Sequence, residues 1–196
     1  MNLVRIVLSA VMVAVSFLVM DSAVAQAQTT DCSKRNPPFP DYDSSEVLRN
    51  VSTNRAGTVP IRRGFYCVPD AAKGDPGEES KWGFGFGYDK ARNRHNIPSL
   101  NAQEFVLKSS SSFKTTDGWN FIAFGREKVC NTGGRDCRVT KEQRVVGASS
   151  EKNSEEYYDM PAGNPVGLLT VYCDYGDPVR LKCEDWVNKA LKNGRG

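Results

Sequence analysis

The spacing of apolar and polar residues predicts a domain built mainly of short strands. Several segments of four to ten residues are apolar or alternate between apolar and polar, and they lie between turn-forming residues, as strands typically do. We predict strands at residues 58–62, 65–68, 104–108, 119–124 and 166–175. The last of these is the most apolar stretch behind the first 27 residues, and we interpret it as a central strand.

The most regular alternation in the chain lies at residues 82–88, where aromatic residues and glycines take turns. A period of two predicts one strand with Trp82, Phe84, Phe86 and Tyr88 on the same face. The glycines leave the other face bare, so another strand, a helix or a ligand is expected to pack closely there. Residues 90–95 are basic and are interpreted as a loop or a single helical turn.

A hairpin is predicted around residues 131–136, which contain a Gly-Gly turn signal. Residues 128–130 and 137–139 flank this turn and would form the two strands, and residues 144–147 would extend the second one. This is the best-defined hairpin in the sequence.

Two helices are expected, one at each end of the domain. The first would begin at Asp43 or Ser44, and Val47 and Val51 would face the core because they are four residues apart. The second would cover residues 184–192, with acidic residues near its start and lysines near its end. The fold class predicted is therefore α+β: a strand-rich, mainly antiparallel sheet with a short N-terminal helix and a C-terminal helix, stabilised by disulfides.

The N-terminus has the pattern of a cleavable secretory signal peptide. Arg5 precedes an uncharged apolar run at residues 6–20, and alanines at alternating positions follow within residues 23–27. A membrane anchor is the alternative, but this run is shorter than a typical spanning helix, and no later stretch is long enough to span. We expect a signal peptide (1–27), an irregular N-terminal arm (28–43) and a single globular domain (44–196), exported to the periplasm or secreted.

An exported chain folds where cysteines oxidise, and this one has an even number of them. The six are Cys32, Cys67, Cys130, Cys137, Cys173 and Cys183. Closure of short loops favours pairing Cys130 with Cys137 and Cys173 with Cys183, which leaves Cys32 with Cys67. A zinc site would need shorter cysteine gaps or more than one histidine, so no metal site is predicted.

The charge and motif content bound the possible functions. The formal net charge of +3 is mildly basic, which permits anionic partners without requiring them. The sequence contains no G-x-S-x-G nucleophile elbow and no phosphate-binding loop with its Lys-Ser/Thr, so we expect no cofactor.

Catalysis would have to involve His95, because it is the only histidine. In a ribonuclease-like reaction His95 would act as acid or base, with Glu104 as its partner and Arg126 holding the phosphate. Other residues of the same types could take these roles: Glu127, Arg92 and Arg94. A histidine in a basic loop is more often a solvated side chain.

A binding surface is the second hypothesis, because the aromatic run leads directly into the basic one. Trp82, Phe84 and Tyr88 beside Arg92 and Arg94 would suit stacking on bases or sugars with contacts to an anion. The simpler interpretation is that the aromatic residues belong to the core and the cations to a solvated turn.

We therefore favour a small exported interaction protein without its own catalysis: an inhibitor, an effector or an envelope-associated module. Its partner would be another protein, or an anionic or glycan ligand, outside the cytoplasm. A small secreted ribonuclease-like hydrolase using His95 is the alternative.

Overall fold

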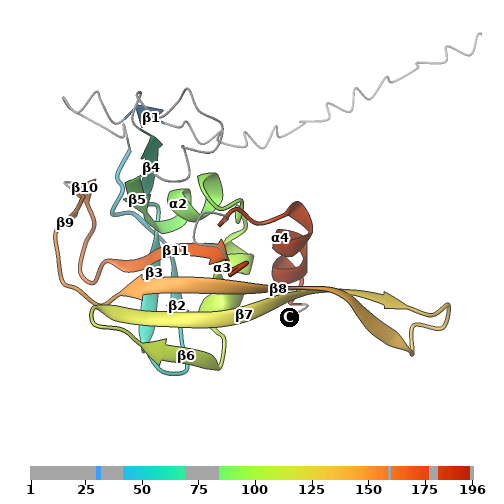
Figure 1. Cartoon of the computed structure of the whole chain (residues 1–196). Coiled ribbons are helices and arrows are strands. Elements are labelled where there is room, and N and C mark those ends of the chain that lie inside the picture. The colour runs from blue at the N-terminus through green and yellow to red at the C-terminus, as the bar shows by residue number, and fades with distance from the viewer. Residues whose placement is uncertain (1–29, 32–41, 69–83, 159, 177–180, 195–196) are drawn as a thin grey trace, which may run out of the picture.

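The computed structural model describes residues 30–31, 42–68, 84–158, 160–176 and 181–194 (Figure 1). The strands are β1 (Thr30–Asp31), β2 (Val47–Ser52), β3 (Thr58–Arg62), β4 (Phe65–Val68), β5 (Phe84–Phe86), β6 (Ser111–Lys114), β7 (Gly118–Cys130), β8 (Cys137–Ser150), β9 (Glu156–Tyr157), β10 (Met160–Pro161) and β11 (Gly167–Cys173). The helices are α2 (Gly87–Asn93), α3 (Leu100–Leu107) and α4 (Asp185–Lys192). The α+β class is confirmed.

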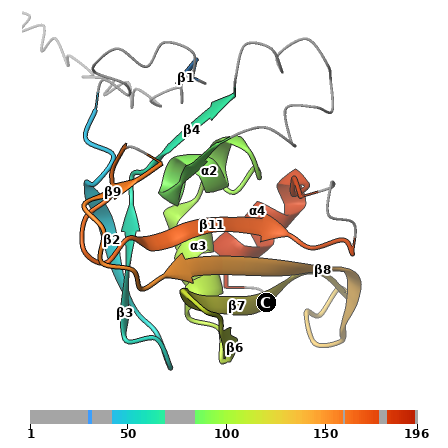
Figure 2. The same cartoon turned by 60° about the vertical axis from the view of Figure 1, so that its left-hand side comes forward.

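The central layer is an antiparallel sheet of four strands in the order β11-β8-β7-β6 (Figure 2). Helix α3 packs against β7 and β8, α4 packs against β7, and α2 packs against β11. Side chains of these elements and of β3 form the main core: Ile61, Val106, Leu107, Phe121, Val145, Leu168, Val171, Val187 and Leu191. Burial of these apolar surfaces is the main favourable contribution to folding.

The prediction of an N-terminal helix was wrong, because this segment contains the strand β2, which pairs with β3. Val51 is buried opposite Val59, whereas Val47 is exposed. Asp43 accepts hydrogen bonds from the backbone and the hydroxyl of Ser45, which closes a local turn instead of starting a helix. Acidic and hydroxyl residues favour both structures, and a four-residue spacing of valines fits a strand as well as a helix.

The aromatic run is not one continuous strand. Strand β5 ends at Phe86, and Tyr88 already lies on α2. Close packing is confirmed at two of the glycines: a Cβ on Gly85 would lie 2.0 Å from the backbone oxygen of Phe65 on β4, and one on Gly87 would lie 2.7 Å from that of Arg62. Gly83 lies outside the described residues. Gly85 also has φ +140°, which disfavours any side chain there.

The strand predicted at residues 104–108 is also wrong, because these residues belong mostly to α3. Ser99 caps this helix by accepting a hydrogen bond from the backbone of Ala102. Gln103 is buried, and its side-chain amide donates a hydrogen bond to the backbone oxygen of Ile97. Because a polar residue takes this core position, the helical spacing of apolar residues is interrupted in the sequence. A polar residue in the core thus weakened the apolar signal.

Strands β3, β4, β7, β8 and β11 and the C-terminal helix α4 lie where the sequence predicted them. Strand β11 is at one end of the four-stranded sheet rather than at its centre. It is nevertheless mostly buried, because α2 and β3 pack against it. Its apolar composition reflects this burial rather than a central position.

No helix within the described ranges is long and apolar enough to cross a membrane. The predicted signal peptide and Trp82 lie outside the described residues, as does nearly all of the predicted N-terminal arm. Both short-range disulfides, Cys130–Cys137 and Cys173–Cys183, are confirmed. Cys67 also takes part in a disulfide, and its predicted partner Cys32 lies outside the described residues.

Candidate functional site

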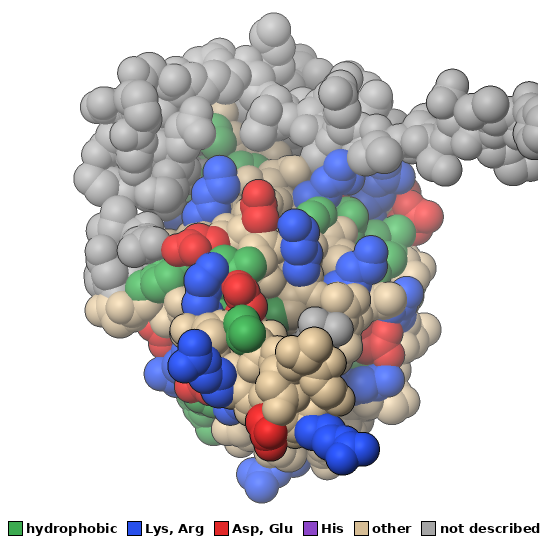
Figure 3. Space-filling model, turned by 90° about the vertical axis from the view of Figure 1, so that its right-hand side faces the viewer, with side chains coloured by type: hydrophobic (Ala, Val, Ile, Leu, Met, Phe, Trp, Pro, Cys, Tyr) green, Lys and Arg blue, Asp and Glu red, His purple; other side chains and the backbone are tan. Residues whose placement is uncertain are grey.

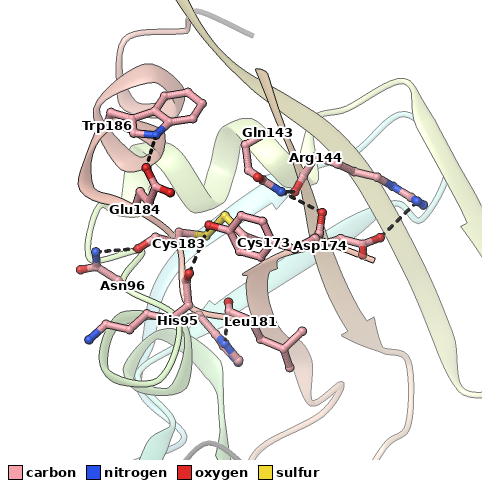
Figure 4. Close-up of a disulfide and its surroundings, with 12 residues drawn as sticks. His95, Asn96, Gln143, Arg144, Cys173, Asp174, Leu181, Cys183, Glu184 and Trp186 are labelled. Carbon is pink, nitrogen blue, oxygen red and sulfur yellow. Dashed lines mark hydrogen bonds and ion pairs between the residues drawn. A yellow bond between two sulfur atoms is a disulfide. The ribbon is translucent and has the colours of Figure 1, made fainter. Parts of the chain in front are cut away.

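His95 follows α2 and is buried, with 2% of its surface exposed. Its Nδ1 lies 3.2 Å from the carbonyl oxygen of Leu181 (Figure 4). Its ring centre lies 5.7 Å from that of Tyr172. Burial, together with the positive charges of Arg94 and Lys90, lowers the pKa of His95 to about 3. The ring is therefore neutral near pH 7, with Nδ1–H donating to Leu181.

The surroundings of His95 have a structural role. The backbone N–H of Cys183 donates to the oxygen of His95 over 3.0 Å, and the amide of Asn96 donates to the oxygen of Cys183 over 2.9 Å. Cys183 is itself joined to Cys173 at the end of β11. These bonds fix the segment that leads into α4 against the sheet (Figure 4).

The structure does not bring the three hypothetical catalytic residues together. Glu104 forms ion pairs with Arg49 at 2.6 Å and with Lys108 at 2.5 Å. Arg126 donates to Glu142 at 2.6 Å. Within the described ranges, no hydrogen bond or ion pair joins His95 to Glu104 or Arg126. The alternative acid, Glu127, pairs with Lys141 at 3.2 Å.

The aromatic residues proposed for binding are divided between two elements. Phe84 is exposed on β5, and its ring lies 6.1 Å from the exposed ring of Tyr158. Tyr88 is half-buried on α2, and its hydroxyl donates to the oxygen of Pro98 over 2.8 Å. Phe84 and Tyr88 therefore do not form one stacking face.

The cations proposed for binding lie on or next to α2. Arg92 and Arg94 are half-buried, as is Lys90. Burial, together with the charge of Arg94, lowers the pKa of Lys90 to about 8. Lys90 and Arg94 therefore partly repel each other.

A second candidate surface is the long hairpin of β7 and β8, whose far end projects from the body of the domain (Figure 1). We call residues 126–142 the hairpin arm. Every residue from 128 to 142 is exposed. Two of them are apolar: Val129 is 49% exposed and Val139 is 48% exposed. The arm therefore leaves about half of the surface of each valine exposed.

The tip of the hairpin arm is closed by several bonds. Cys130 and Cys137 are directly paired across the two strands and form a disulfide. In the turn between them, the amide of Asn131 donates to the carboxylate of Asp136 over 2.6 Å. The N–H of Gly134 donates to the oxygen of Asn131 over 2.8 Å, and Gly134 has φ +67°. These contacts hold the tip in one shape.

The hairpin arm has an excess of positive charge. It contains five Lys or Arg and three Asp or Glu. The acidic residues are engaged, since Glu127 and Glu142 form ion pairs and Asp136 binds Asn131. Three cations form no ion pair within the described part of the chain: Lys128, Arg135 and Arg138. Viewed from the side toward which the arm points, Lys and Arg side chains are spread over the surface with acidic ones between them (Figure 3).

The sequence predicted the hairpin but not that it is a separate exposed arm. One signal was present in the sequence. Residues 126–142 include the two segments predicted as strands of the hairpin, yet they contain few apolar residues. Two strands without an apolar face cannot cover a core. Such a pattern next to a local cysteine pair indicates a projecting ribbon.

The two disulfides are expected to differ in their ease of reduction. Cys130 and Cys137 are exposed, whereas Cys173 and Cys183 are 0% and 3% exposed. Exchange requires a thiolate to reach a sulfur atom, so mild dithiothreitol should open Cys130–Cys137 first. Alkylation of the native protein followed by peptide mass spectrometry measures the order. Opening of Cys173–Cys183 first would contradict the assigned burial.

Comparison with known proteins gives no identification. No protein-family model matches the chain. No curated protein and no solved structure matches it either. Function is therefore argued from the site alone.

Proposed function

We propose that this chain is an exported interaction protein without its own catalysis, and that the hairpin arm is its binding surface. The observation that carries this proposal is the exposure of Val129 and Val139 on a ribbon that a disulfide holds in shape. Ordering a ribbon costs conformational entropy, and the arm does not recover that cost by covering a core. The cross-strand pairs Val129–Arg138 and Lys128–Val139 place the two valines on opposite faces of the ribbon, so a partner that contacts both faces would bury both valines.

The disulfide at the tip supports a binding role for the arm. Isolated two-stranded ribbons are marginally stable in water. A cross-link between Cys130 and Cys137 restricts the open conformations and so pre-forms the surface. A surface that is already ordered loses less entropy when it binds.

Export is supported by the cysteines and by the N-terminal pattern. The structure contains two disulfides between described cysteines, and such bonds persist mainly in oxidising compartments. Together with the predicted signal peptide, they favour a periplasmic or secreted protein. The partner would be met there, and the chain would act as an inhibitor, an effector or an envelope-associated module.

The ribonuclease-like alternative gains no support from the geometry. An acid that donates a proton near pH 7 needs a pKa near that value, whereas burial lowers the pKa of His95 to about 3. Its Nδ1 is engaged with Leu181. Glu104 and Arg126 are occupied by other side chains.

Site-specific photo-crosslinking tests the proposal. A photoreactive residue would replace Val129 or Val139, and the same residue at Val47 would serve as control, because Val47 is a similarly exposed valine on β2. The proteins would be incubated with extract of the exported compartment and irradiated. We expect protein adducts from the two arm positions and not from Val47. Equal adducts from all three positions, or none from the arm, would contradict a specific binding surface.

A further inference from the structure

The outer edge of β7 is open along the hairpin arm. Strand β6 pairs with β7 only from Trp119 to Ile122, while β7 continues to Cys130. Beyond Ile122, no described strand pairs with the outer side of β7. In an antiparallel ribbon, alternate residues direct their N–H and C=O groups away from the partner strand. These groups are available to another extended chain.

Helix α4 covers one face of β7 next to this open edge. It packs against β7 at Gly125, where a Cβ would lie 3.2 Å from the side chain of Val187. Between the two elements is a groove, which we call the edge groove. It is lined by Arg126, Glu127, Lys128, Trp186, Lys189, Ala190 and Asn193. Its volume of about 170 Å³ is below that of typical small-molecule pockets, and it suits one or two side chains.

The charges at the edge groove favour an acidic occupant. Glu127 is neutralised by Lys141, and Arg126 by Glu142. Lys128 and Lys189 are exposed and form no ion pair with any described residue. The unbalanced charge at the groove is therefore positive, and carboxylates would complement it.

We propose that the edge groove receives an extended acidic segment of a partner protein, which adds as a strand to the outer edge of β7 beyond Ile122. Its backbone would pair with β7, as in other strand-addition complexes. Its acidic side chains would lie beside Lys128 and Lys189, and its apolar ones against Trp186 and Val129. This inference rests on the proposed function, since it specifies what the hairpin arm binds.

The chemistry favours a peptide over a nucleic acid. The exposed Val129 gains nothing from phosphate but would pack against a side chain. The half-buried ring of Trp186 could pack against a peptide side chain or a base, so it does not distinguish the two ligands.

A synthetic peptide of alternating valine and glutamate tests the proposal with the full mature protein. Two further versions carry N-methyl groups on every second residue, one version for each edge of the extended peptide. N-methylation removes backbone donors from one edge and leaves the charge unchanged. We expect the parent peptide and one methylated version to bind alike by calorimetry. The other version should bind about tenfold more weakly or worse.

Charge-reversal variants give the second readout. Lys128→Glu and Lys189→Glu should each weaken the parent peptide about tenfold. Arg55→Glu is the matched control, because Arg55 is an exposed cation without an ion pair among the described residues, and it should leave binding unchanged. Circular dichroism would confirm that each variant folds.

Three results would overturn the proposal: no binding of the parent peptide, equal binding of both methylated versions, or tighter binding of a single-stranded oligonucleotide of equal charge. The proposed function is tested separately by the photo-crosslinks at Val129 and Val139. Adducts there without peptide binding would reject the edge groove alone. Absence of both would reject the hairpin arm as a binding surface.

Discussion

Replacing Cys173 and Cys183 by alanine is expected to destabilise the protein by about 3–5 kcal/mol. The disulfide restricts the unfolded chain, and its sulfur atoms are buried in the core, so the substitution loses both the cross-link and core packing. The substitution also removes the cross-link that holds the segment around Cys183, whose backbone N–H donates to the oxygen of His95. For a domain of this size, the melting temperature should fall by about 10 °C.

The matched control replaces Cys130 and Cys137 by alanine. These residues lie at the exposed tip of the hairpin arm, where the strands can separate without opening the core. The global melting temperature should therefore change much less, while partner binding should weaken. Calorimetry of both variants compares them directly. An equal or larger loss of global stability from the tip variant would contradict the assignment of Cys173–Cys183 as the core cross-link.

Acidification from pH 7 to pH 5 is expected to cost about 2 kcal/mol through His95 alone. The folded-state pKa of His95 is lowered to about 3, mainly by burial. As pH falls below about 6.5, the unfolded chain takes up a proton at this histidine and the folded chain does not. The unfolded state then binds more protons, so stability is complete above this range and is lost as pH falls toward the folded-state pKa.

His95→Asn isolates this contribution. The amide of asparagine can still donate to the oxygen of Leu181, but it does not titrate. Because the chain has no other histidine, the difference in unfolding free energy between the two proteins should change with pH through this group alone. Urea unfolding at both pH values measures it. Parallel pH dependence of the two proteins would show that His95 is exposed or already charged in the fold.

The elements that the sequence predicted correctly have strong local signals. The Gly-Gly turn between two strand patterns located the hairpin of β7 and β8, and short spacing located both described disulfides. Helix α4 has dipole-compatible charges at both ends. In each case the local preference agrees with the tertiary structure.

The incorrect predictions have tertiary causes. The turn at Asp43 resembles a helix start, and only the pairing of β2 with β3 decides between them. The buried Gln103 interrupts the apolar period of α3, and it is buried because α3 packs against β7 and β8. Single-segment patterns show neither the pairing of β2 nor this packing.

The candidate site was predicted only in its parts. Composition singled out His95 because it is the sole histidine, yet its burial depends on Leu181 and Tyr172, distant in sequence. The hairpin was visible, but its exposure depends on where β6 and β11 stop pairing with it. Exposure is a property of the assembled sheet, so local patterns could not supply it.

Shortening the hairpin arm tests whether the arm is the binding surface. Residues 128–140 would be replaced by Asn-Gly, which connects the paired residues Glu127 and Lys141 by a two-residue turn. Wild-type and shortened proteins, immobilised at equal density, would be incubated with extract of the exported compartment, and bound proteins quantified by mass spectrometry. We predict that the amount of each protein enriched by the wild type falls about tenfold or more with the shortened variant, which keeps its core and its melting temperature. Equal enrichment by both proteins, or no enrichment by the wild type, would contradict it.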